Sequence, residues 1–340
     1  MKPQILLIYT GGTIGMIKDP ITATLKAFDF KSLLEKIPEL NLLDCEIHTV
    51  SFETPIDSSN MNPSHWITIA TLIEKNYKTH DGFVVLHGSD TMSYTASALS
   101  FMLENLAKPV ILTGSQLPIG DLRTDAKENL ITSIQIAALQ NNHTSVVKEV
   151  GLYFEYKLYR GNRTTKINAE HFQAFASLNF PALVTSGVHL KVNHELLHKN
   201  YAHAPLIVHK KMDTNIMLVK LFPGISPIVL QSTLEIPSLK AVVIETYGSG
   251  NATTEDWFLQ AIEKALHKGI LIINITQCAG GSVHMSQYQT GKFLEKSGVI
   301  SGKDMTTESA ITKIMYMLGL QMPKNMFKTV FETSLRGEIS

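Results

Sequence analysis

Residues 5–15 read ILLIYTGGTIG, a run of apolar and β-branched residues, with a strand expected at Ile5–Tyr9, that passes into a loop of glycines and threonines. A buried strand that ends in such a loop is typical of the first βα unit of a parallel sheet. Two further apolar runs of similar length follow at Phe83–Leu86 and Val110–Thr113. The sequence therefore predicts several strands of one parallel sheet in the N-terminal half of the chain.

Stretches with helical periodicity separate and follow these strands. Asn62 and Pro63 supply an N-cap and a first-turn proline, after which apolar residues recur at helical spacing. Two more helices are expected at about Thr91–Leu106 and Arg123–Leu139, each after a predicted strand. This alternation of strand and helix predicts an α/β fold.

The alternation weakens after Tyr153 and returns beyond a polar stretch at Val188–Lys211 that is rich in histidine and lysine. A chain of 340 residues exceeds what one hydrophobic core usually serves, so two domains are expected. We place a larger N-terminal α/β domain with a parallel sheet at 1–190, a connector at 191–212 and a smaller C-terminal α/β domain at 213–340. The C-terminal strands are expected at Ile216–Leu221, Ala241–Thr246 and Ile270–Ile275, and the helices at Ser226–Leu234, Thr254–His267, Thr307–Leu318 and Pro323–Thr333.

Composition excludes several classes of protein. Lysine plus arginine equals aspartate plus glutamate at 30 each, and apolar residues make up 44% of the chain, which argues against a nucleic-acid-binding polycation or an acidic disordered chain. No apolar run is long enough to span a membrane, and the N-terminus lacks the features of a secretory leader. Cys45 and Cys278 are too far apart in sequence to suggest a disulfide framework or a paired-cysteine metal site. We therefore expect a cytoplasmic protein with a small-molecule partner, and neither a nucleic-acid nor a membrane partner.

Three polar clusters follow predicted strands, at Thr10–Gly15, His87–Thr91 and Thr113–Gln116. In an open parallel sheet, ligands bind beyond the carboxyl ends of the strands, where glycines allow close approach of backbone amides and hydroxyls serve as nucleophiles or donors. Any one cluster is also ordinary chemistry for a βα turn and a helix cap. The first cluster lacks the lysine of a P-loop and the G-x-G-x-x-G spacing, so nucleotide binding is disfavoured. Together the three clusters suit chemistry at a polarised carbonyl group.

Six segments along the chain carry these and related polar residues in a characteristic order. They are Tyr9–Met16, Asp57–Ser59, His87–Met92, Arg160–Lys166, Tyr247–Asn251 and Asn274–Cys278. In this order they resemble the L-asparaginase family over nearly the whole chain, most closely its bacterial type I branch. The resemblance implies an amidohydrolase that converts L-asparagine and water to L-aspartate and ammonia through a β-aspartyl ester on a threonine, without a cofactor. It also implies a symmetric homodimer, with a tetramer as the alternative.

The roles that the resemblance implies can be carried over by position. Thr13 stands where the family's nucleophile stands, and a hydroxyl in that role needs a base and a means of stabilising the oxyanion. Ser89, Asp90 and Lys166 match a second cluster, in which the lysine relays a proton through the hydroxyl and the aspartate grips the substrate's α-ammonium group. A surface charge for Lys166 and a helix cap for Asp90 are the simpler alternatives. Asn251 is implied to reach the site from a neighbouring subunit. The residues implied to surround the substrate are Asp57, Ser58, Ser59, Ser89, Asp90, Ser115 and Asn251.

Two departures from the family pattern concern the reaction. Members usually carry threonine where Ser89 stands, and serine keeps the hydroxyl but loses the methyl group that restricts the rotamer. Many members have a tyrosine in the loop after Met16 that polarises the nucleophile, whereas Ile17–Phe28 contains none. Thr22 or Thr24 is the candidate near that position, and no equivalent is found for the glutamate that assists the tyrosine in type II enzymes.

Type I relatives include enzymes with a second, regulatory asparagine site near the position of Cys278. In them an arginine, which suits the effector's carboxylate, stands at the position aligned with Glu245. Because Glu245 reverses that charge, we expect no strong allosteric activation by asparagine. The alternative is that another cation, such as Lys240 or one within 188–211, holds the effector.

Residues 194–198 read HELLH and match the H-E-x-x-H zinc pattern. So short a pattern also matches by chance, no apolar helix flanks it, and no third ligand is identifiable. We therefore expect a solvated linker there and no metal site. His87 is expected to be a hydrogen-bonded residue at a strand end rather than a base.

Two other functions stay open at this point. One is the asparaginase-like subunit of a tRNA-dependent amidotransferase, although such subunits carry an extra N-terminal domain and Thr13 lies almost at the start of this sequence. The other is a non-catalytic amino-acid sensor, which needs head-group ligands but no nucleophile. The presence of Thr13 together with Ser89, Asp90 and Lys166 argues against the sensor.

Overall fold

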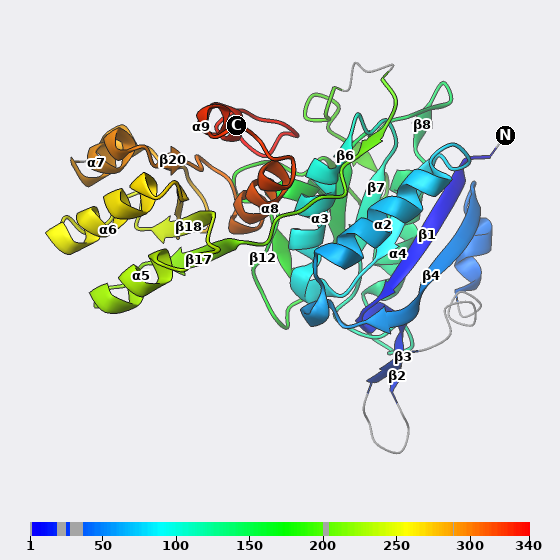
Figure 1. Cartoon of the computed structure of the whole chain (residues 1–340). Helices are drawn as coiled ribbons and strands as arrows, with labels where there is room; N and C mark the ends of the chain where they lie inside the picture. The colour runs from blue at the N-terminus through cyan, green and yellow to red at the C-terminus, as the bar shows by residue number, and fades with distance from the viewer. Residues whose placement is uncertain (1, 19–24, 28–36, 200–203, 288) are drawn as a thin grey trace. The chain divides into compact units, whose positions relative to one another are not determined.

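The computed structural model describes residues 2–18, 25–27, 37–199, 204–287 and 289–340. The chain folds into two units, Met1–Lys210 and Lys211–Ser340, each built on its own β-sheet (Figure 1). This confirms the predicted α/β class with a larger N-terminal and a smaller C-terminal domain. No helix within the described ranges is both long and apolar enough to cross a lipid bilayer.

The sheet of the first unit positions the polar loops. Within the described residues it has eight strands in the order β15-β14-β11-β10-β7-β5-β1-β4. The strands β10, β7, β5, β1 and β4 run parallel to one another. The bounds are β1 (Gln4–Gly11), β4 (Glu46–Ile56), β5 (Gly82–Leu86), β7 (Val110–Thr113), β10 (Val150–Phe154), β11 (Lys157–Arg160), β14 (Val184–Thr185) and β15 (Lys191–Val192).

The strands that the sequence predicted are among the parallel ones, and beyond β10 the sheet continues with antiparallel strands that it did not predict. Strand β10 turns directly into β11 through Glu155 and Tyr156, whose φ angles are 50° and 67°. A two-residue turn with both φ angles positive matches the right-handed twist of the flanking strands, so it closes a tight hairpin. Neither residue is a usual turn former, so the pattern contained no signal for this hairpin.

Part of the segment 191–212, predicted as the connector, pairs with strands of the first unit. Lys191–Val192 (β15) lies beside β14 in the large sheet. Ile207–Val208 (β16) pairs with Leu103–Glu104 (β6) in a separate two-stranded sheet. Three other short pairs complete the described strands. They are β2 (Met16–Lys18) with β3 (Leu25–Ala27), β8 (Gln140–Asn141) with β9 (Thr144–Ser145), and β12 (Thr165–Lys166) with β13 (Phe175–Ala176).

Helices cover both faces of the parallel strands. Helix α4 (Ala126–Ala137) packs on one face, in a core that includes Ile5 and Leu7 of β1. Helices α2 (Pro63–Asn76) and α3 (Met92–Met102) lie on the other face (Figure 1). A sheet covered on both faces explains why β1, β5 and β7 are continuous apolar runs.

The boundaries of these helices follow from local hydrogen bonds. Helix α2 begins at Pro63, as predicted, because the Asn62 side chain accepts a hydrogen bond from Ser64 N at 3.0 Å. Helix α3 stops before the predicted Leu106 because the next two residues form β6. Helix α4 begins after the predicted Arg123, since Thr124 Oγ1 accepts a hydrogen bond from Ala126 N at 3.0 Å.

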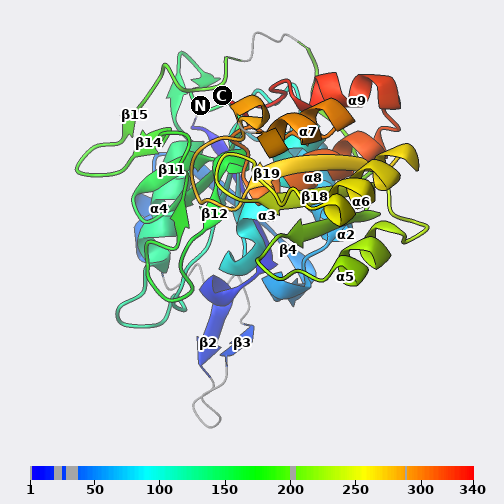
Figure 2. The ribbon, with the colours of Figure 1, turned by 90° about the vertical axis from the view of Figure 1, so that its left-hand side faces the viewer.

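The second unit is the predicted smaller α/β domain, and its sheet is parallel, with the order β17-β18-β19-β20 in the described residues. Helices α5 and α6 pack on one face, where Leu230, Phe258 and Ile272 share one core. Helix α8 lies on the other face (Figure 2). The bounds are β17 (Ile216–Lys220), β18 (Ala241–Thr246), β19 (Leu271–Thr276), β20 (Ile300–Ser301), α5 (Pro227–Leu234), α6 (Asp256–His267), α7 (Gln289–Ser297), α8 (Thr307–Gly319) and α9 (Lys324–Phe331).

A buried ion pair fixes the segment after α9 to α8. Lys313 and Glu338 are both fully buried and form the pair. The ammonium group of Lys313 also donates to the carbonyl oxygens of Phe331 and Thr333, both at 2.7 Å. The carboxylate of Glu338 accepts hydrogen bonds from the backbone N–H groups of the nearby turn, including that of Leu335 at 2.9 Å. Both charges therefore have several partners, as buried charges require.

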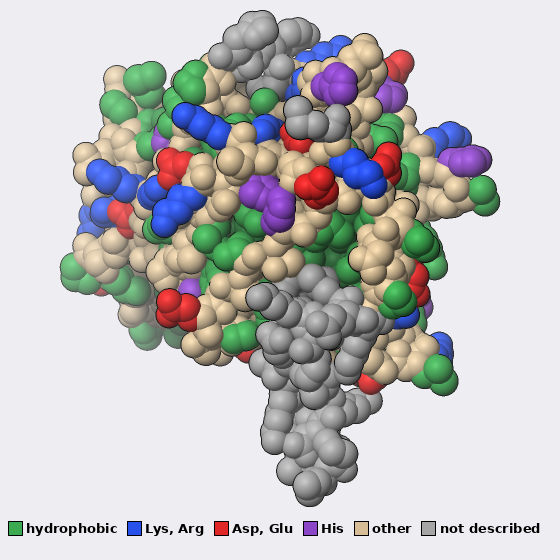
Figure 3. All heavy atoms as spheres, turned by 90° about the vertical axis from the view of Figure 1, so that its right-hand side faces the viewer, with side chains coloured by type: hydrophobic (Ala, Val, Ile, Leu, Met, Phe, Trp, Pro, Cys, Tyr) green, Lys and Arg blue, Asp and Glu red, His purple; other side chains and the backbone are tan. Residues whose placement is uncertain are grey.

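One face of the first unit carries lysines and arginines interspersed with aspartates and glutamates (Figure 3). A surface of mixed sign lacks the extended positive field that attracts nucleic acids. This view agrees with the equal counts of 30 basic and 30 acidic residues.

Candidate active site

The order of the parallel strands marks where a ligand would bind in the first unit. Along the chain, β1 is followed by β4 on one side of it and then by β5 on its other side. The connections that leave β1 and β5 therefore run in opposite directions, and a crevice opens between such loops at the carboxyl ends of the strands. Three loops leave the carboxyl ends of β1, β4 and β5 at this edge of the sheet, and they begin at Gly12, Asp57 and His87.

Glycines bring these loops into direct backbone contact. Gly12 has a φ of +88°, and a Cβ atom on it would lie 2.5 Å from the backbone nitrogen of Gly88. A Cβ on Gly88 would lie 2.5 Å from Ser58 Oγ, and one on Gly114 would lie 2.3 Å from the carbonyl oxygen of His87. No side chain fits at these three positions without displacing a neighbour. The loops after β1, β4, β5 and β7 therefore form one packed cluster, as the three polar clusters of the sequence predicted.

Three of the predicted site residues are joined by hydrogen bonds. Lys166 Nζ donates to Ser89 Oγ at 2.9 Å and to Asp90 Oδ1 at 2.7 Å. Lys166 belongs to β12, whereas Ser89 and Asp90 follow β5, so the fold brings together residues from distant parts of the sequence. The Lys166 side chain is 17% exposed and that of Asp90 is 64% exposed. The carboxylate is thus open to a soluble ligand, while the ammonium group is largely covered.

Asp57, Ser58 and Ser59 form a tight turn at the end of β4. The backbone N–H and the hydroxyl group of Ser59 both donate to Asp57 Oδ1 at 2.9 Å. These two hydrogen bonds lower the pKa of Asp57, so its exposed carboxylate is ionised at neutral pH. Ser58 is buried, and its carbonyl oxygen accepts a hydrogen bond from Thr91 Oγ1 at 2.7 Å. This bond ties the loop after β4 to the loop after β5.

Thr13 follows Gly12 and is half-buried at the start of a short helical turn, Thr13–Gly15. Ser115 is buried, and its hydroxyl group donates to the carbonyl oxygen of Leu117 at 2.6 Å. That hydroxyl proton is therefore used within its own loop. The predicted contact of Ser115 with a substrate stays a prediction, as do the roles of the other site residues.

His87 is a structural residue at the end of β5, as predicted. It is fully buried, and its Nδ1 lies 2.6 Å from the carbonyl oxygen of Gly88. Its Nε2 lies 2.9 Å from Thr95 Oγ1, which accepts a hydrogen bond from Trp66 Nε1 at 3.0 Å. Burial lowers the pKa of His87 to about 4. The neutral ring therefore donates through Nδ1 and accepts through Nε2, which fixes the backbone beside Ser89.

Gln116 contacts the site, although the sequence suggested no role for it beyond its place in a polar cluster. Its Oε1 accepts a hydrogen bond from Ser89 Oγ at 3.1 Å. Its position in the sequence relative to the other site residues matches no known motif, so the sequence alone did not indicate this contact. Its importance appears only when the fold shows which side chain faces it.

Asn251 and Glu245 belong to the second unit. Asn251 closes a turn in which its backbone N–H and carbonyl oxygen are both hydrogen-bonded to Tyr247 at 2.8 Å. The carboxylate of Glu245 accepts a hydrogen bond from Thr307 Oγ1 at 2.6 Å and lies 3.4 Å from Lys220 Nζ. Lys240 instead pairs with an aspartate, Asp213, at 2.5 Å. The absence of a regulatory asparagine site stays a prediction.

The HELLH segment does not have the geometry of a zinc motif. Residues 194–197 lie in turn and bend conformations rather than in a helix, so the two histidines are not one helical turn apart. The backbone N–H of His198 donates to Glu149 Oε1 at 2.7 Å. Across the described ranges, no group of three or more histidine, cysteine, aspartate or glutamate side chains is placed to hold a metal ion.

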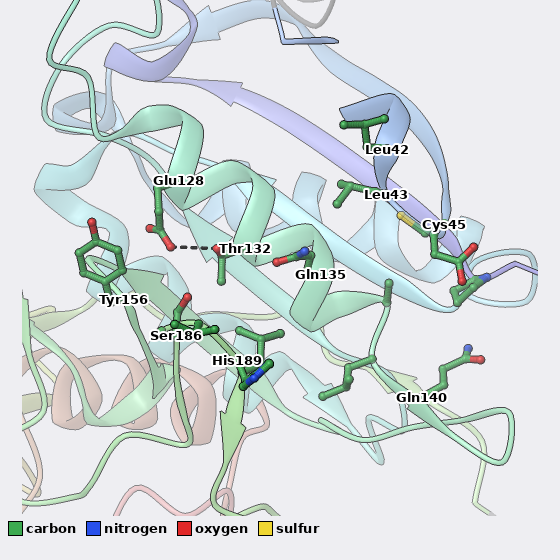
Figure 4. A pocket seen from close by; sticks show the side chains of 17 residues that line it. Leu42, Leu43, Cys45, Glu128, Thr132, Gln135, Gln140, Tyr156, Ser186 and His189 are labelled. Carbon is green, nitrogen blue, oxygen red and sulfur yellow. Dashed lines mark hydrogen bonds between the residues drawn. The ribbon is translucent and has the colours of Figure 1, made fainter. Parts of the chain in front are cut away.

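A separate groove runs along α4 (Figure 4). Its volume is about 930 Å³. Glu128, Thr132 and Gln135 of α4 line one side of the groove, and Leu42 and His189 are also among its lining residues. Thr132 donates a hydrogen bond to Glu128 within it, at 2.9 Å. None of the predicted site residues is among the residues that line this groove. Its size alone therefore does not make it the active site.

Some of the predicted residues lie outside the described ranges. Thr22 and Thr24, the candidates to replace the loop tyrosine, are among them. The group that activates Thr13 is therefore not assigned.

Comparison with known proteins identifies the family. The family described as "Asparaginase, N-terminal" matches residues 4–198, and the "Glutaminase/Asparaginase C-terminal domain" matches residues 215–331. L-asparaginase 1 of Escherichia coli (strain K12) is 42% identical over 345 aligned positions, which cover 100% of this chain and 98% of that protein. The 60 kDa lysophospholipase of Mus musculus is 40% identical and aligns with 99% of this chain and 62% of its own length.

A solved structure agrees with this result. The crystal structure of L-asparaginase I from Vibrio cholerae O1 biovar eltor str. N16961 matches with a TM-score of 0.90 and 37% sequence identity, and the match covers 100% of both chains. The sequence matches and the fold thus extend over both units. The chain belongs to the asparaginase family.

Proposed function

We propose that the protein is an L-asparaginase, which hydrolyses L-asparagine to L-aspartate and ammonia. The contact of Lys166 with Ser89 and Asp90, beside the glycine loop that holds Thr13, is the observation that carries this proposal. Such a cluster combines a hydroxyl nucleophile, a proton relay and an anionic group for an amino-acid substrate. The 42% identity with an E. coli protein named L-asparaginase 1 supports asparagine as the substrate.

In the first half of the proposed reaction, Thr13 Oγ1 attacks the side-chain carbonyl carbon of L-asparagine. A carbon–oxygen bond forms, and the carbon–nitrogen bond breaks once the nitrogen has gained the proton that the threonine loses. Ammonia departs and a β-aspartyl ester of Thr13 is left. Backbone N–H groups of the glycine loops are suitable donors for the oxyanion that develops during this step.

In the second half, water attacks the ester carbon and the bond to Thr13 Oγ1 breaks. The proton that the water loses returns to Thr13, and L-aspartate is released. The 2.9 Å contact between Lys166 Nζ and Ser89 Oγ provides a path for that proton, because a hydroxyl group can donate and accept at the same time.

In this proposal, the site offers an anionic group that complements the positive charge of the substrate's α-ammonium group. Asp90 and Asp57 are exposed carboxylates, and Asp90 pairs with the α-ammonium group. Asp57, Ser58, Ser59 and Ser115 surround the head group. Asn251 reaches the site from the second unit of a neighbouring subunit in a symmetric homodimer, with a tetramer as the alternative. A cytoplasmic location and a reaction without a cofactor complete the proposal.

Replacing the nucleophile tests the proposal. Thr13→Ala is expected to fold normally, to bind L-aspartate and to lose at least about a thousandfold in kcat for ammonia release from L-asparagine, since the covalent route is deleted. Thr13→Ser, which keeps a hydroxyl group, is the control and should retain measurable turnover. L-Glutamine and D-asparagine, assayed in parallel, define the substrate. Ammonia release by Thr13→Ala at a rate near that of the wild type would refute the assignment.

A further inference from the structure

The side chain of Gln116 joins the two halves of the Ser89–Lys166 pair. Its Oε1 accepts a hydrogen bond from Ser89 Oγ at 3.1 Å. Its Nε2 donates to the carbonyl oxygens of Ala169 and His171, both at 3.1 Å. The last two residues lie in the loop that follows Lys166. One side chain thus contacts both the serine and the segment that carries the lysine.

The orientation of this amide is fixed by its partners. The carbonyl oxygens of Ala169 and His171 can only accept hydrogen bonds, so the NH₂ group of Gln116 must face them. Its oxygen then faces Ser89, and the Ser89 hydroxyl must donate its proton there. Because the protonated Lys166 Nζ donates to the same hydroxyl at 2.9 Å, the hydrogen bonds of the resting site run from Lys166 to Ser89 to Gln116. In the proposed relay, a neutral Lys166 accepts the Ser89 proton, and the resting direction returns once the lysine is protonated again.

The backbone at both ends of this link is held in place. Gln116 N donates to both carboxylate oxygens of Asp125, at 3.1 and 3.0 Å. In the loop after Lys166, the side chain of Asn168 accepts hydrogen bonds from the backbone nitrogens of Glu170 and His171 at 2.9 and 2.8 Å. Gln116 therefore connects two anchored segments, the loop after β7 and the β12–β13 hairpin.

We propose that Gln116 is a positioning residue, which selects one rotamer of Ser89 and holds the hairpin so that Lys166 reaches it. Serine has no branched Cβ, so its own χ1 preference is weak and an external hydrogen bond decides the direction of the hydroxyl group. Gln116 acts through Ser89 and Lys166 and does not bind the substrate. This inference rests on the proposed function for its kinetic consequences, but the rotamer of Ser89 can be measured without them.

The first experiment replaces Gln116 by methionine, which keeps the length of the side chain and removes its hydrogen bonds. Gln116→Met is expected to lower kcat for L-asparagine by roughly ten- to a hundredfold, because a small misplacement of a catalytic group costs this much. The KM should change by less than about threefold, because no substrate contact is lost. Gln173→Met, at an exposed glutamine of the same hairpin, is the matched control and should leave both constants unchanged.

A second change separates positioning from simple destabilisation. Adding Ser89→Thr to Gln116→Met supplies a branched Cβ that restricts the rotamer from within. The double variant should regain about tenfold in kcat over Gln116→Met alone. A loss caused by general unfolding would not be rescued in this way.

Crystal structures of the two variants provide a readout that does not need activity. Ser89 should occupy more than one rotamer in Gln116→Met and a single rotamer in the double variant. A single, unchanged rotamer in Gln116→Met, or a kcat within twofold of the wild type, would overturn the inference. A wild-type protein that releases no ammonia from L-asparagine would refute the proposed function, whereas the rotamer of Ser89 would still decide the role of Gln116.

Discussion

Gly12 shows how a single residue sets the geometry of the candidate site. Its φ of +88° is unfavourable for any residue with a Cβ, and its α-carbon faces the backbone of Gly88. Gly298 has a similar φ of +100°, but no atom lies within 4 Å of the place where its Cβ would be. The two glycines thus share a positive φ angle, and only Gly12 makes the close contact.

Gly12→Ala is therefore expected to do more harm than Gly298→Ala. Both substitutions place a Cβ on a backbone with a positive φ angle, which should cost about 1–3 kcal/mol each. Gly12→Ala must in addition separate the loops after β1 and β5, which should lower kcat/KM for L-asparagine by at least about a hundredfold. Steady-state kinetics and melting temperatures of the two variants measure the difference. Equal activity in the two variants would show that the contact with Gly88 is not important.

The buried ring of His87 makes the first unit sensitive to acid. Its pKa is lowered to about 4 in the folded protein by burial, whereas an unfolded histidine has a pKa of about 6.5. Between these values the unfolded chain binds a proton that the folded chain does not, so the free energy of unfolding falls as the pH decreases from 6.5 to 4. The expected loss is about 3 kcal/mol, at 1.36 kcal/mol for each unit of difference.

This loss can be measured with Trp66, which lies in the first unit and bonds to a partner of His87. The chain has 2 tryptophans, so Trp257→Phe leaves Trp66 as the reporter during urea unfolding. His87→Gln in that background should be less stable at neutral pH but should lose little further stability between pH 6.5 and 4. His189→Gln, at an exposed histidine, is the control. The same slope with pH in all three proteins would contradict this explanation.

At the scale of helices and strands, the sequence predicted elements whose boundaries have a local cause. Helix α2 starts at Pro63 because of its cap, and β18 spans the predicted Ala241–Thr246 because apolar residues run without interruption through a covered sheet. The β10–β11 hairpin could not be predicted, because its turn residues, Glu155 and Tyr156, have no turn preference. The candidate site likewise contains residues that the sequence predicted and residues that it did not. The hydroxyl and glycine clusters are visible in the sequence, whereas Gln116 depends on what the β12–β13 hairpin places opposite it.

Helix α8 depends on a contact that no periodicity reveals. Lys313 lies on this helix and is fully buried with Glu338. Burial alone would raise the pKa of Glu338, but the ion pair and two backbone N–H groups outweigh it and lower that pKa below its usual value. Removing one partner of such a pair leaves an uncompensated charge in the core, which costs far more than the pair contributes when it is intact.

Lys313→Met is accordingly expected to destabilise the second unit by about 3–5 kcal/mol. Lys324→Met, at an exposed lysine that donates to Gly269 O at 3.1 Å, should cost less than about 0.5 kcal/mol. Urea unfolding in a Trp66→Phe background, with Trp257 of the second unit as the reporter, measures both values. Adding Glu338→Gln to Lys313→Met should recover part of the loss. A loss of the same size in Lys324→Met would indicate a general effect of removing lysines.

For the whole molecule, the two units each contribute residues to the proposed reaction. Thr13, Ser89 and Lys166 belong to the first unit and Asn251 to the second. If each active site combines the first unit of one subunit with the second unit of another, two inactive variants can complement each other. Complementation therefore tests the proposed homodimer and the proposed role of Asn251 together.

Mixing Thr13→Ala with Asn251→Ala under conditions of subunit exchange is expected to restore part of the activity. One site of each mixed dimer would then contain both intact residues, so the activity should approach a quarter of the wild-type value per site at full exchange of equal amounts, on a rough statistical estimate. Mixing Thr13→Ala with Lys166→Ala, both changed in the first unit, serves as the control for exchange without complementation, because no mixed site would contain both intact residues. Proven exchange without recovered activity would mean that each subunit contains a complete site.

The glycine contacts between the loops also limit how the specificity of this protein can evolve or be engineered. Where backbone touches backbone, as at Gly12 and Gly88, there is no side chain that a mutation could shorten to admit a larger substrate. Mutant libraries aimed at these positions should yield mostly inactive clones. New substrates are more accessible through changes at Asp57 and Ser59, exposed residues that we propose surround the head group, or at residues that reach the site from outside the cluster. The close packing of the loops thus leaves the exposed residues around them as the positions where substitutions can change the specificity.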